Sequence, residues 1–389
     1  MDAERREIAY FTGSFLPPSE IFMVEQARHL TKYKPRFIAA QRHASRVARQ
    51  YPMQVDCLSD SVRGRVAAAK LKLCGWVDPM FRRMIKNAGL LHAQFGKNGY
   101  LAWPVAKGLD LPFVTTFHGF DATFVGNPLT VEGFNQRLFF WRGRREMAKA
   151  GLNCIAVSNY IRGRLLELGF PEHRIFRRYI GIDTTLFTPQ PGIERVKNRV
   201  VCVSRFIEYK GHRFIVDALA RLSRSGIPVE LIMIGQGALR DDVERSARGK
   251  IKKVTVLDDL NQKEILSLLC TAQLYLHGSY KTSTGHAEAL GLSILEAQAA
   301  GTPVVAFDSG GTGEALAHNK SGYLVAEKDV NAMSDKAAAL LTDTNRWQSF
   351  SQAGVDFVRT NFDITGCSKL LEETYDNVVR EHASERSAQ

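Results

Sequence analysis

Two glutamates stand eight residues apart, at Glu288 and Glu296, in a segment that continues through Gly301 and Pro303 into an apolar run. If this segment were helical throughout, about 100° per residue would place the two side chains roughly 80° apart around the axis. Gly291 instead favours a loop at Glu288 and a helix that carries Glu296 one to two turns inside it. The alternative is an amphipathic helix with two solvated glutamates.

A helix that begins near Gly291 would leave the backbone N–H groups of Gly291, Leu292 and Ser293 without partners inside the helix. Unpaired N–H groups at a helix N-terminus bind anions. An anion held there would lie between the two glutamates, which suits a nucleoside diphosphate joined to sugars.

Arg205, Lys210 and Gly211 follow the apolar run 199–203. Arginine grips phosphate oxygens through two parallel hydrogen bonds, and lysine adds a compact charge. Beside the expected helix start at Gly291, these cations would neutralise a diphosphate leaving group. The alternative is a pair of ordinary surface cations.

His118 follows the apolar run 113–117 and precedes Gly119. Ligands of open α/β sheets bind beyond the carboxyl ends of the strands, and glycine lets the backbone approach a ligand closely. We therefore predict that His118 contacts substrate, against the alternative of a structural histidine. Residues 92–99 repeat the pattern with a weaker signal.

Short apolar runs alternate with helical patterns along the whole chain. Fully apolar short strands separated by helices are typical of buried parallel sheets. We predict an α/β protein of two doubly wound, Rossmann-like domains. The expected strands are residues 8–12, 36–40, 89–93, 113–117 and 154–158, then 199–203, 229–234, 253–257, 274–277 and 304–307.

The best linker candidate is the stretch 187–192, which contains two prolines and a glycine. It predicts a first domain over residues 1–188 and a second over 196–365. Residues 366–389 are expected to form a C-terminal helix, packed back toward the first domain, and a polar tail. We expect disorder in that tail, residues 381–389.

The net charge of +12 is distributed unevenly. Residues 1–180 contain 28 Lys and Arg against 14 Asp and Glu, a net charge of +14, and the remainder carries −2. A basic half predicts a polyanionic partner such as a membrane surface, and a solvated basic face is the alternative. Residues 63–76 and 137–145 mix cations with aromatic or aliphatic side chains, as interfacial segments do.

The chain contains no apolar run of the roughly 18 residues needed to span a bilayer, and its start lacks a signal-peptide pattern. Its six cysteines are scattered without a CxxC pair, which predicts reduced core thiols. We therefore expect a cytoplasmic protein, peripheral at the inner face of the cytoplasmic membrane.

Taken together, these motifs resemble the family-4-type retaining glycosyltransferases of GT-B fold, over nearly the whole chain. Glu288 and Glu296 match the family's E-x7-E signature, and Arg205 with Lys210-Gly211 matches its Arg…Lys-Gly element. Gly235-Gln-Gly237 resembles its glycine turn. Residues 92–96 and 116–121 look most like bacterial exopolysaccharide, capsule and colanic-acid-type transferases.

The resemblance implies roles for the residues of the second half. Arg205 and Lys210 would bind the donor diphosphate, and backbone N–H groups of residues 291–293 would cradle phosphate. Glu296 would hydrogen-bond the ribose. Glu288 would face the donor sugar or stabilise positive charge that develops on it.

In the first half, the resemblance implies that His118 contacts the donor sugar near its anomeric carbon. The resemblance counts His118 as catalytic, together with Glu288, Arg205 and Lys210. Gly13 and Ser14, in a loop expected at 12–15, and Asp121 would contact the acceptor. That loop has one glycine where many family members have two.

The implied reaction moves a sugar from a UDP- or GDP-linked donor to a glycan acceptor, carried on polyprenyl diphosphate, in surface polysaccharide biosynthesis. It would retain the anomeric configuration and need no metal and no further cofactor. The acceptor would attack on the face from which the diphosphate leaves. A soluble small-molecule acceptor is the alternative.

Three other classes fit the sequence less well. Residues 310–316 match a dinucleotide-binding fingerprint only in part, because Leu316 stands where a third glycine or alanine belongs. His286-Ala-Glu288 has the H-x-E form of zinc deaminases, but no P-C-x-x-C follows. A non-catalytic nucleic-acid-binding protein is suggested by charge alone, so we expect no nucleic-acid partner.

Overall fold

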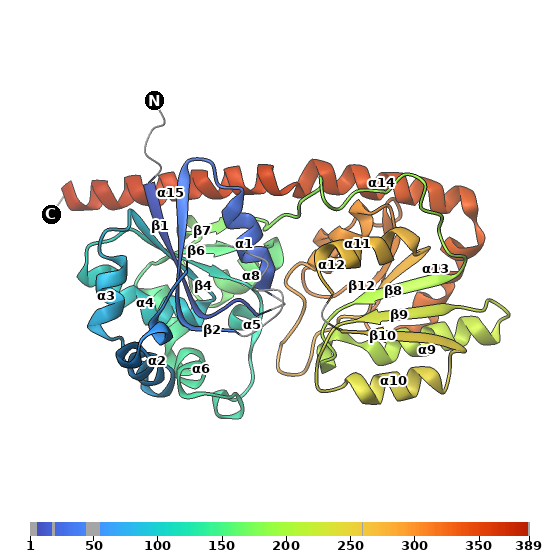
Figure 1. The fold of residues 1–389 in the computed structure, drawn as a ribbon, viewed down its shortest axis with the longest axis horizontal. Helices are drawn as coiled ribbons and strands as arrows, with labels where there is room; N and C mark the ends of the chain where they lie inside the picture. The colour runs from blue at the N-terminus through green and yellow to red at the C-terminus, as the bar shows by residue number, and fades with distance from the viewer. Residues whose placement is uncertain (1–5, 18–19, 44–54, 259, 388–389) are drawn as a thin grey trace. The chain divides into compact units, whose positions relative to one another are not determined.

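The computed structural model describes residues 6–17, 20–43, 55–258 and 260–387, which Figure 1 draws as a ribbon. The chain forms two compact units. The first combines Met1–Gly181 with Ile364–Gln389, and the second is Ile182–Asp363. Each unit is built on a parallel sheet, as the alternation of strands and helices predicts.

The sheet of the first unit has seven strands in the order β3-β2-β1-β4-β5-β6-β7. All five strands predicted in the first half are present. The sequence did not indicate β3 and β7, because three residues are too few to show a periodic pattern. The strands are β1 (Arg6–Phe15), β2 (Tyr33–Arg42), β3 (Val55–Cys57), β4 (Leu90–Gln94), β5 (Phe113–Phe117), β6 (Asn153–Ala156) and β7 (Ile175–Arg177).

Alternate residues of the first sheet enter two cores, because successive side chains of a strand point to opposite faces. Ile8 and Tyr10 pack on one face of the sheet, and Ala9 and Phe11 on the other. The helices of the unit are α1 (Ile21–Arg28), α2 (Val62–Cys74), α3 (Pro79–Ile85), α4 (Gly96–Gly108), α5 (Phe120–Thr123), α6 (Phe134–Leu138), the π-helical turn η5 (Phe139–Gly143), α7 (Arg144–Lys149), α8 (Asn159–Glu167) and α15 (Ile364–Ser387).

The second unit contains a six-stranded sheet in the order β10-β9-β8-β11-β12-β13. Its strands are β8 (Arg199–Val203), β9 (Glu230–Ile234), β10 (Lys253–Leu257), β11 (Leu274–His277), β12 (Val304–Phe307) and β13 (Gly322–Val325). All but β13 were predicted. The residues of β9 and β12 are buried throughout, as expected for a sheet covered on both faces.

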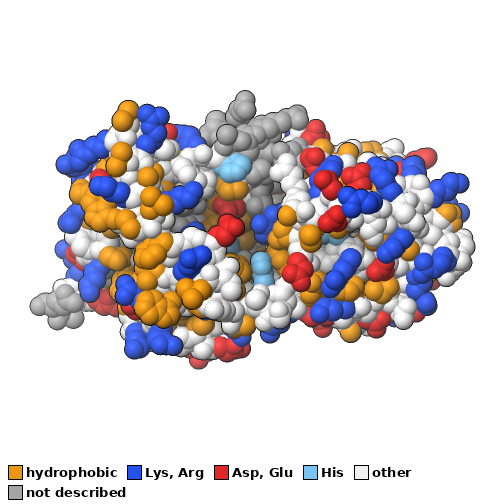
Figure 2. All heavy atoms as spheres, turned by 90° about the horizontal axis from the view of Figure 1, so that it is seen from below, with side chains coloured by type: hydrophobic (Ala, Val, Ile, Leu, Met, Phe, Trp, Pro, Cys, Tyr) orange, Lys and Arg blue, Asp and Glu red, His pale blue; other side chains and the backbone are white. Residues whose placement is uncertain are grey.

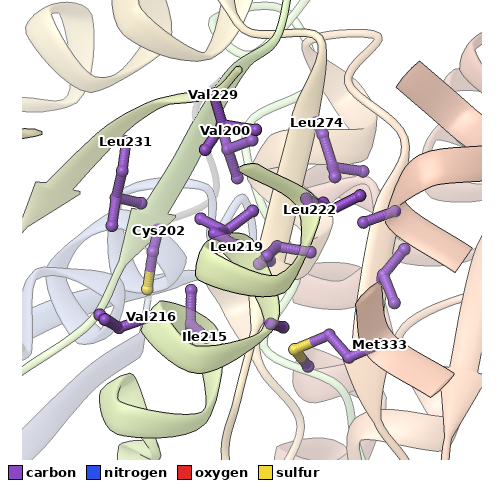
Figure 3. Close-up of a cluster of buried hydrophobic side chains, with 14 of the residues drawn as sticks. Val200, Cys202, Ile215, Val216, Leu219, Leu222, Val229, Leu231, Leu274 and Met333 are labelled. Carbon is purple, nitrogen blue, oxygen red and sulfur yellow. The ribbon is translucent and has the colours of Figure 1, made fainter. Parts of the chain in front are cut away.

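Helices flank this second sheet. Figure 3 shows Ile215, Val216, Leu219 and Leu222 of α9 pointing toward Val200 and Cys202 of β8, which gives the unit its apolar core. The helices are α9 (His212–Arg224), α10 (Arg240–Arg248), α11 (Gln262–Thr271), α12 (Leu292–Ala299), α13 (Val330–Thr342) and α14 (Thr344–Phe362).

The boundary between the units lies at Gly181, earlier than the predicted end of the first domain at residue 188. The stretch 187–192 belongs to the second unit, where Thr188 accepts hydrogen bonds from Arg359 and Cys270. Proline and glycine mark the end of regular structure there, but this segment packs like the rest of the unit. The predicted start of the C-terminal helix at 366 lies two residues inside α15.

The predicted disorder of the C-terminal tail is wrong for residues 381–387, which continue α15 as helix. Arg174 of the first unit pairs with Glu381 and Glu385 of this helix, at 2.9 and 2.7 Å. Arg386 pairs with Asp110 at 2.8 Å. These ion pairs provide partners for charges that otherwise suggest a solvated tail. Residues 388–389 lie outside the described part of the chain.

The cysteines match their prediction with one exception. Five are buried thiols outside any disulfide, but Cys74, the last residue of α2, is exposed. None of the helices in the described ranges is long and apolar enough to cross a membrane.

Candidate functional site

The order of strands in the second sheet reverses between β8 and β11, which are neighbours in the sheet but separated in the chain by β9 and β10. In open α/β sheets the loops after two such strands diverge, and ligands bind in the crevice between them. Arg205 and Lys210 follow β8, and Glu288 follows β11. The structure therefore brings together the two signatures found in the sequence.

Lys210 ends a short 3-10 helix, η7 (Glu208–Lys210), and Gly211 begins the turn into α9. Gly211 has φ of 62°, and a Cβ there would come within 1.9 Å of the Gly278 carbonyl oxygen, just after β11. Only glycine fits this close approach of the two loops. The Lys-Gly pair thus sets Lys210 beside the β11 loop.

Glu288 lies in the loop between β11 and α12, as predicted, and its carboxylate accepts three hydrogen bonds. Lys210 forms an ion pair with Oε2. His277 Nε2 lies 3.1 Å and Ser279 Oγ 3.0 Å from the same oxygen. The buried face of the loop therefore holds Glu288 in one orientation and keeps the Lys210 ammonium at the switch point.

Burial alone would raise the pKa of Glu288, but the charge of Lys210 and the hydrogen bond from His277 hold that pKa well below its usual range. Burial would likewise lower the pKa of Lys210, and the charge of Glu288 raises it instead. Both groups are therefore ionised near neutral pH. Burial lowers the pKa of His277, which keeps its imidazole neutral.

Arg205 differs from Lys210, because its side chain is exposed and forms no ion pair with the described residues. Its positive charge opposes the rise in the pKa of Lys210 and helps to lower the pKa of His286, so the three groups lie near one another. His286 stacks on Tyr209, with ring centroids 3.9 Å apart. The loop after β8 thus carries two cations: Lys210, which pairs with Glu288 of the loop after β11, and Arg205, which is exposed.

Helix α12 begins at Leu292, and Gly291 precedes it in a left-handed conformation with φ of 96°. In the described chain the backbone N–H groups of Leu292 and Ser293 donate no hydrogen bond, as predicted for a helix start. The Ser293 hydroxyl accepts a hydrogen bond from Tyr275 at 2.8 Å. An anion at this terminus would meet N–H groups and a fixed hydroxyl.

Glu296 lies one turn inside α12, as predicted, and is partly buried. Burial raises its pKa to about 8. Its carboxyl has no hydrogen-bond partner among the described side chains and backbone groups. Glu288 and Glu296 are therefore electrostatically distinct: Glu288 is ionised and paired, and Glu296 is largely protonated at neutral pH.

The first unit has a reversal of its own, between β1 and β4. Gly13 and Ser14 lie near the end of β1, His92 and Gln94 in β4, and His118 just after β5. The predicted loop at 12–15 is wrong, because parallel pairing with β2 continues to Phe15 and Arg42. Gly13 and Ser14 thus lie at the carboxyl end of a strand.

His118 is partly buried, and its Nε2 lies 2.7 Å from the side-chain oxygen of Gln94. Burial lowers the pKa of His118 to about 3, so the ring is neutral. Asp121 is buried, and its carboxylate accepts backbone N–H groups of Gly96, His118 and Gly119 at 2.8 to 3.1 Å. Asp121 therefore shapes the turn that carries His118, and its acceptor contact stays a prediction.

Gln94, the partner of His118, adjoins a hydrogen-bonded network around His92 in the first unit. His92 Nδ1 lies 2.8 Å from the Tyr375 hydroxyl, and Nε2 lies 2.7 Å from the Thr116 hydroxyl. Tyr375, on α15, also hydrogen-bonds Tyr10 at 2.5 Å. The C-terminal helix therefore helps to fix the strand ends of the first unit.

Two family models match the chain. Residues 19–186 match Glycosyltransferase Family 4, and residues 183–356 match Glycosyl transferases group 1. The chain is a family-4-type glycosyltransferase of GT-B fold.

Sequence relatives of this glycosyltransferase carry different names. It is 31% identical to the GDP-mannose-dependent alpha-(1-6)-phosphatidylinositol monomannoside mannosyltransferase of Mycobacterium tuberculosis. That alignment of 214 residues covers 52% of this chain and 56% of the mycobacterial protein. It is 29% identical over 281 residues to the colanic acid biosynthesis glycosyltransferase WcaL of Escherichia coli, covering 69% and 64%. The aligned part thus spans less than two thirds of these relatives.

Solved structures agree on the fold. HepE from Anabaena, in complex with UDP and glucose, matches with a TM-score of 0.75 and 17% identity, over 96% of this chain and all of that one. The sucrose-phosphate synthase of Thermosynechococcus elongatus matches with a TM-score of 0.73 and 18% identity, over 97% of this chain and 100% of that one. The glycosyltransferase therefore shares an architecture with proteins of different named activities.

Sequence reasoning missed several residues of these sites: His277, Ser279, Gln94 and Tyr375. Each contacts a predicted residue only through pairing of strands or docking of α15. One signal was available, since His277 ends the predicted strand 274–277 and Ser279 follows two residues later. The described residues contain no group of three or more metal-binding side chains.

Proposed function

We propose that this glycosyltransferase moves a sugar from a nucleoside-diphosphate donor to a glycan acceptor. The observation that carries the proposal is the pairing of Lys210 with Glu288 at the β8/β11 switch point, beside the exposed Arg205. These cations and the start of α12 offer the positive charge that a diphosphate needs.

In the proposed reaction an acceptor hydroxyl oxygen bonds to the anomeric carbon as the bond from that carbon to the diphosphate oxygen breaks. Negative charge then develops on the leaving phosphate, where Arg205 and Lys210 stabilise it. The hydroxyl proton passes to that phosphate. Attack on the face from which the diphosphate leaves would retain the anomeric configuration, as the family resemblance implies.

For the donor we propose a UDP- or GDP-linked sugar. HepE binds UDP and glucose, and the mycobacterial relative uses GDP-mannose. A thermal-shift panel of UDP, GDP, ADP and their sugars tests the choice. A nucleotide at 100 times its dissociation constant stabilises the folded state by roughly 2.7 kcal/mol.

Transfer itself is tested with radiolabelled donors of the stabilising nucleotide and extracted lipid-linked glycan as acceptor. The anomeric configuration of the product, read by proton NMR, tests retention. Failure of every nucleotide and nucleotide sugar to shift the melting temperature would contradict the proposed function. Transfer only to a water-soluble acceptor would favour the alternative substrate class.

For the acceptor we propose a sugar on polyprenyl diphosphate, reached by peripheral binding to the anionic inner face of the cytoplasmic membrane. An exposed surface of the first unit supports this proposal. Figure 2 shows hydrophobic side chains set among lysines and arginines there. The exposed hydrophobic residues on and around α2, the 3-10 turn η4 (Pro128–Thr130) and α6 are Val62, Val66, Leu73, Trp76, Leu129, Phe134 and Trp141.

Helices α2 and α6 contact each other, because Asn135 of α6 donates hydrogen bonds to the carbonyls of Leu71 and Lys72. Their exposed residues therefore form one surface, which we call the α2/α6 surface. It also carries cations, including Arg63, Arg65, Lys70, Arg137 and Arg142.

The predicted interfacial segment 137–145 contains three aromatic residues, and only one of them is exposed. Phe139 and Phe140 are 0% and 6% exposed in the core, and Trp141 is 71% exposed. All three aromatic residues belong to the π-helical turn η5, whose buried side holds the two phenylalanines. One exposed tryptophan beside Arg142 still suits a headgroup region.

A further inference from the structure

His118 has one nitrogen bound and one nitrogen free. Nε2 lies 2.7 Å from the Gln94 side-chain oxygen, and Nδ1 is buried without a partner among the described residues. The ring also packs against Phe22 and Phe95, at centroid distances of 5.1 and 4.6 Å. These two aromatic contacts and the hydrogen bond to Gln94 restrict the orientation of the imidazole.

Gln94 is only 3% exposed, and its contact with the His92 network limits which way its side-chain amide can face. Its side-chain nitrogen lies 3.3 Å from His92 Nε2. Both nitrogens of His92 are engaged, with Thr116 and with Tyr375. The Gln94 oxygen is therefore directed at His118 and its NH₂ group at His92.

A carbonyl oxygen only accepts hydrogen bonds, so the Nε2 that faces it must carry the proton. The other nitrogen of a neutral imidazole then carries a lone pair. His118 is neutral because burial lowers its pKa. Nδ1 is consequently an acceptor, and a buried acceptor without a partner is a position at which a hydroxyl can bind with little competition from water.

We propose that Gln94 is a positioning residue that holds His118 in its Nε2–H tautomer, so that Nδ1 accepts a hydrogen bond from a hydroxyl group of the bound sugar. This inference rests on the proposed function, and it adds the tautomer, the atom and the residue that fixes them. It gives His118 the role of an acceptor, and excludes it as a proton donor at Nδ1.

The first test is nitrogen-15 NMR of histidine-labelled full-length protein at pH 7, which separates the two tautomers and the imidazolium. We expect the wild-type His118 to show the Nε2–H pattern. Gln94→Leu should remove it, giving a mixture of tautomers. His29, whose Nδ1 faces the Glu25 carbonyl, should not change in the variant.

Thr116→Val is the matched control, because Thr116 contacts His92 in the same network but not His118. We expect it to leave the His118 tautomer unchanged. In the transfer assay, Gln94→Leu should lower kcat/KM about tenfold, the usual size of one lost hydrogen bond. Thr116→Val should change kcat/KM less than threefold, because it leaves the hydrogen bond between Gln94 and His118 in place.

Gln94→Glu keeps an acceptor oxygen and adds charge, which raises the pKa of His118. The titratable groups that face His118 are His92 and Asp121, and both are unchanged in this variant. We expect Gln94→Glu to recover activity over Gln94→Leu at alkaline pH and to lose it on acidification, as the imidazolium forms. Wild-type His118 should not titrate above pH 5.

An Nδ1–H tautomer or an imidazolium in the wild type would overturn the inference. So would an unchanged His118 pattern in a folded Gln94→Leu variant. If that variant does not fold, the wild-type spectrum and the Gln94→Glu profile still decide. The predicted tautomer in a protein that binds no nucleotide sugar would count against the proposed function and leave the role of Gln94 toward His118 in place.

Discussion

Lys210 and Glu288, 78 residues apart in the chain, form an ion pair between the loops that follow the adjacent strands β8 and β11. Both side chains are 12% exposed. Because His277 and Ser279 bind the same carboxylate oxygen, Glu288 holds the lysine in place. A donor diphosphate would therefore find the Lys210 ammonium already oriented.

The first prediction concerns the two cations. Arg205→Ala and Lys210→Ala should each lower kcat by about a hundredfold, or on the order of 3 kcal/mol, because charge builds on the leaving group in the transition state. Steady-state kinetics with the donor identified by thermal shift measures the effect. Arg224→Ala, an exposed arginine at the end of α9, is the control and should change little. Near-wild-type turnover in both variants would show that the diphosphate binds elsewhere.

The second prediction separates the two glutamates. Glu288→Ala should mainly lower turnover, and Glu296→Ala should mainly weaken nucleotide binding. Removing Glu288 also leaves Lys210 without its counter-charge, which costs about 3 kcal/mol of folding free energy for a buried pair. The double variant Lys210→Met, Glu288→Leu should recover part of that loss in urea unfolding. Opposite kinetic effects would mean that the two roles are exchanged.

The third prediction concerns pH. Burial raises the pKa of Glu296 to about 8 from 4.5, so between these values the folded state binds more protons than the unfolded state. The stabilisation is full below pH 4.5 and is lost as pH rises through 8. Wild-type melting temperature should therefore fall more steeply between pH 5 and 8 than that of Glu296→Gln. Parallel curves would disprove the shift.

The fourth prediction concerns metal. Arg205 and Lys210 supply the positive charge that a divalent cation would give a diphosphate, so we expect activity without added metal. Transfer should continue in EDTA, measured with donor and acceptor at saturation. Loss of activity in EDTA and recovery with magnesium or manganese would refute this prediction.

The fifth prediction concerns the α2/α6 surface. Vesicles with anionic lipid should sediment the protein at low salt and release it at high salt, because each cation near such a surface contributes roughly 1 kcal/mol that salt screens. The double variant Phe134→Ser, Trp141→Ser should sediment less. Leu370→Ser, at an exposed position on α15, is the control. Equal sedimentation with neutral vesicles would argue against the surface and favour a soluble acceptor.

Much of the fold follows from the sequence alone. The strands β5, β8, β10, β11 and β12 have the bounds that their apolar runs predict. β5, β11 and β12 are buried at every position, and a strand covered on both faces shows its limits as a continuous apolar run. The order of Arg205, Lys210, Glu288 and Glu296 likewise indicated the family, and their role at a donor site stays a prediction.

The partners of those residues depended on tertiary structure. Glu288 meets Lys210, His277 and Ser279 because β8 pairs with β11, and strand order is not encoded in the local pattern. Tyr375 reaches His92 because α15 returns to the first unit. Contacts between residues far apart in the chain arise from the packing of whole elements.

The charge state and exposure of individual side chains also depended on the fold. Glu288 and Glu296 look alike in the sequence, yet a lysine lowers the pKa of Glu288 and burial raises that of Glu296. Phe140 and Trp141 are neighbours, yet one is in the core and one is exposed. The sequence determined which side chains are available and in which order. The tertiary structure alone decided which of them are charged, buried or exposed, because these properties depend on neighbours that only packing supplies.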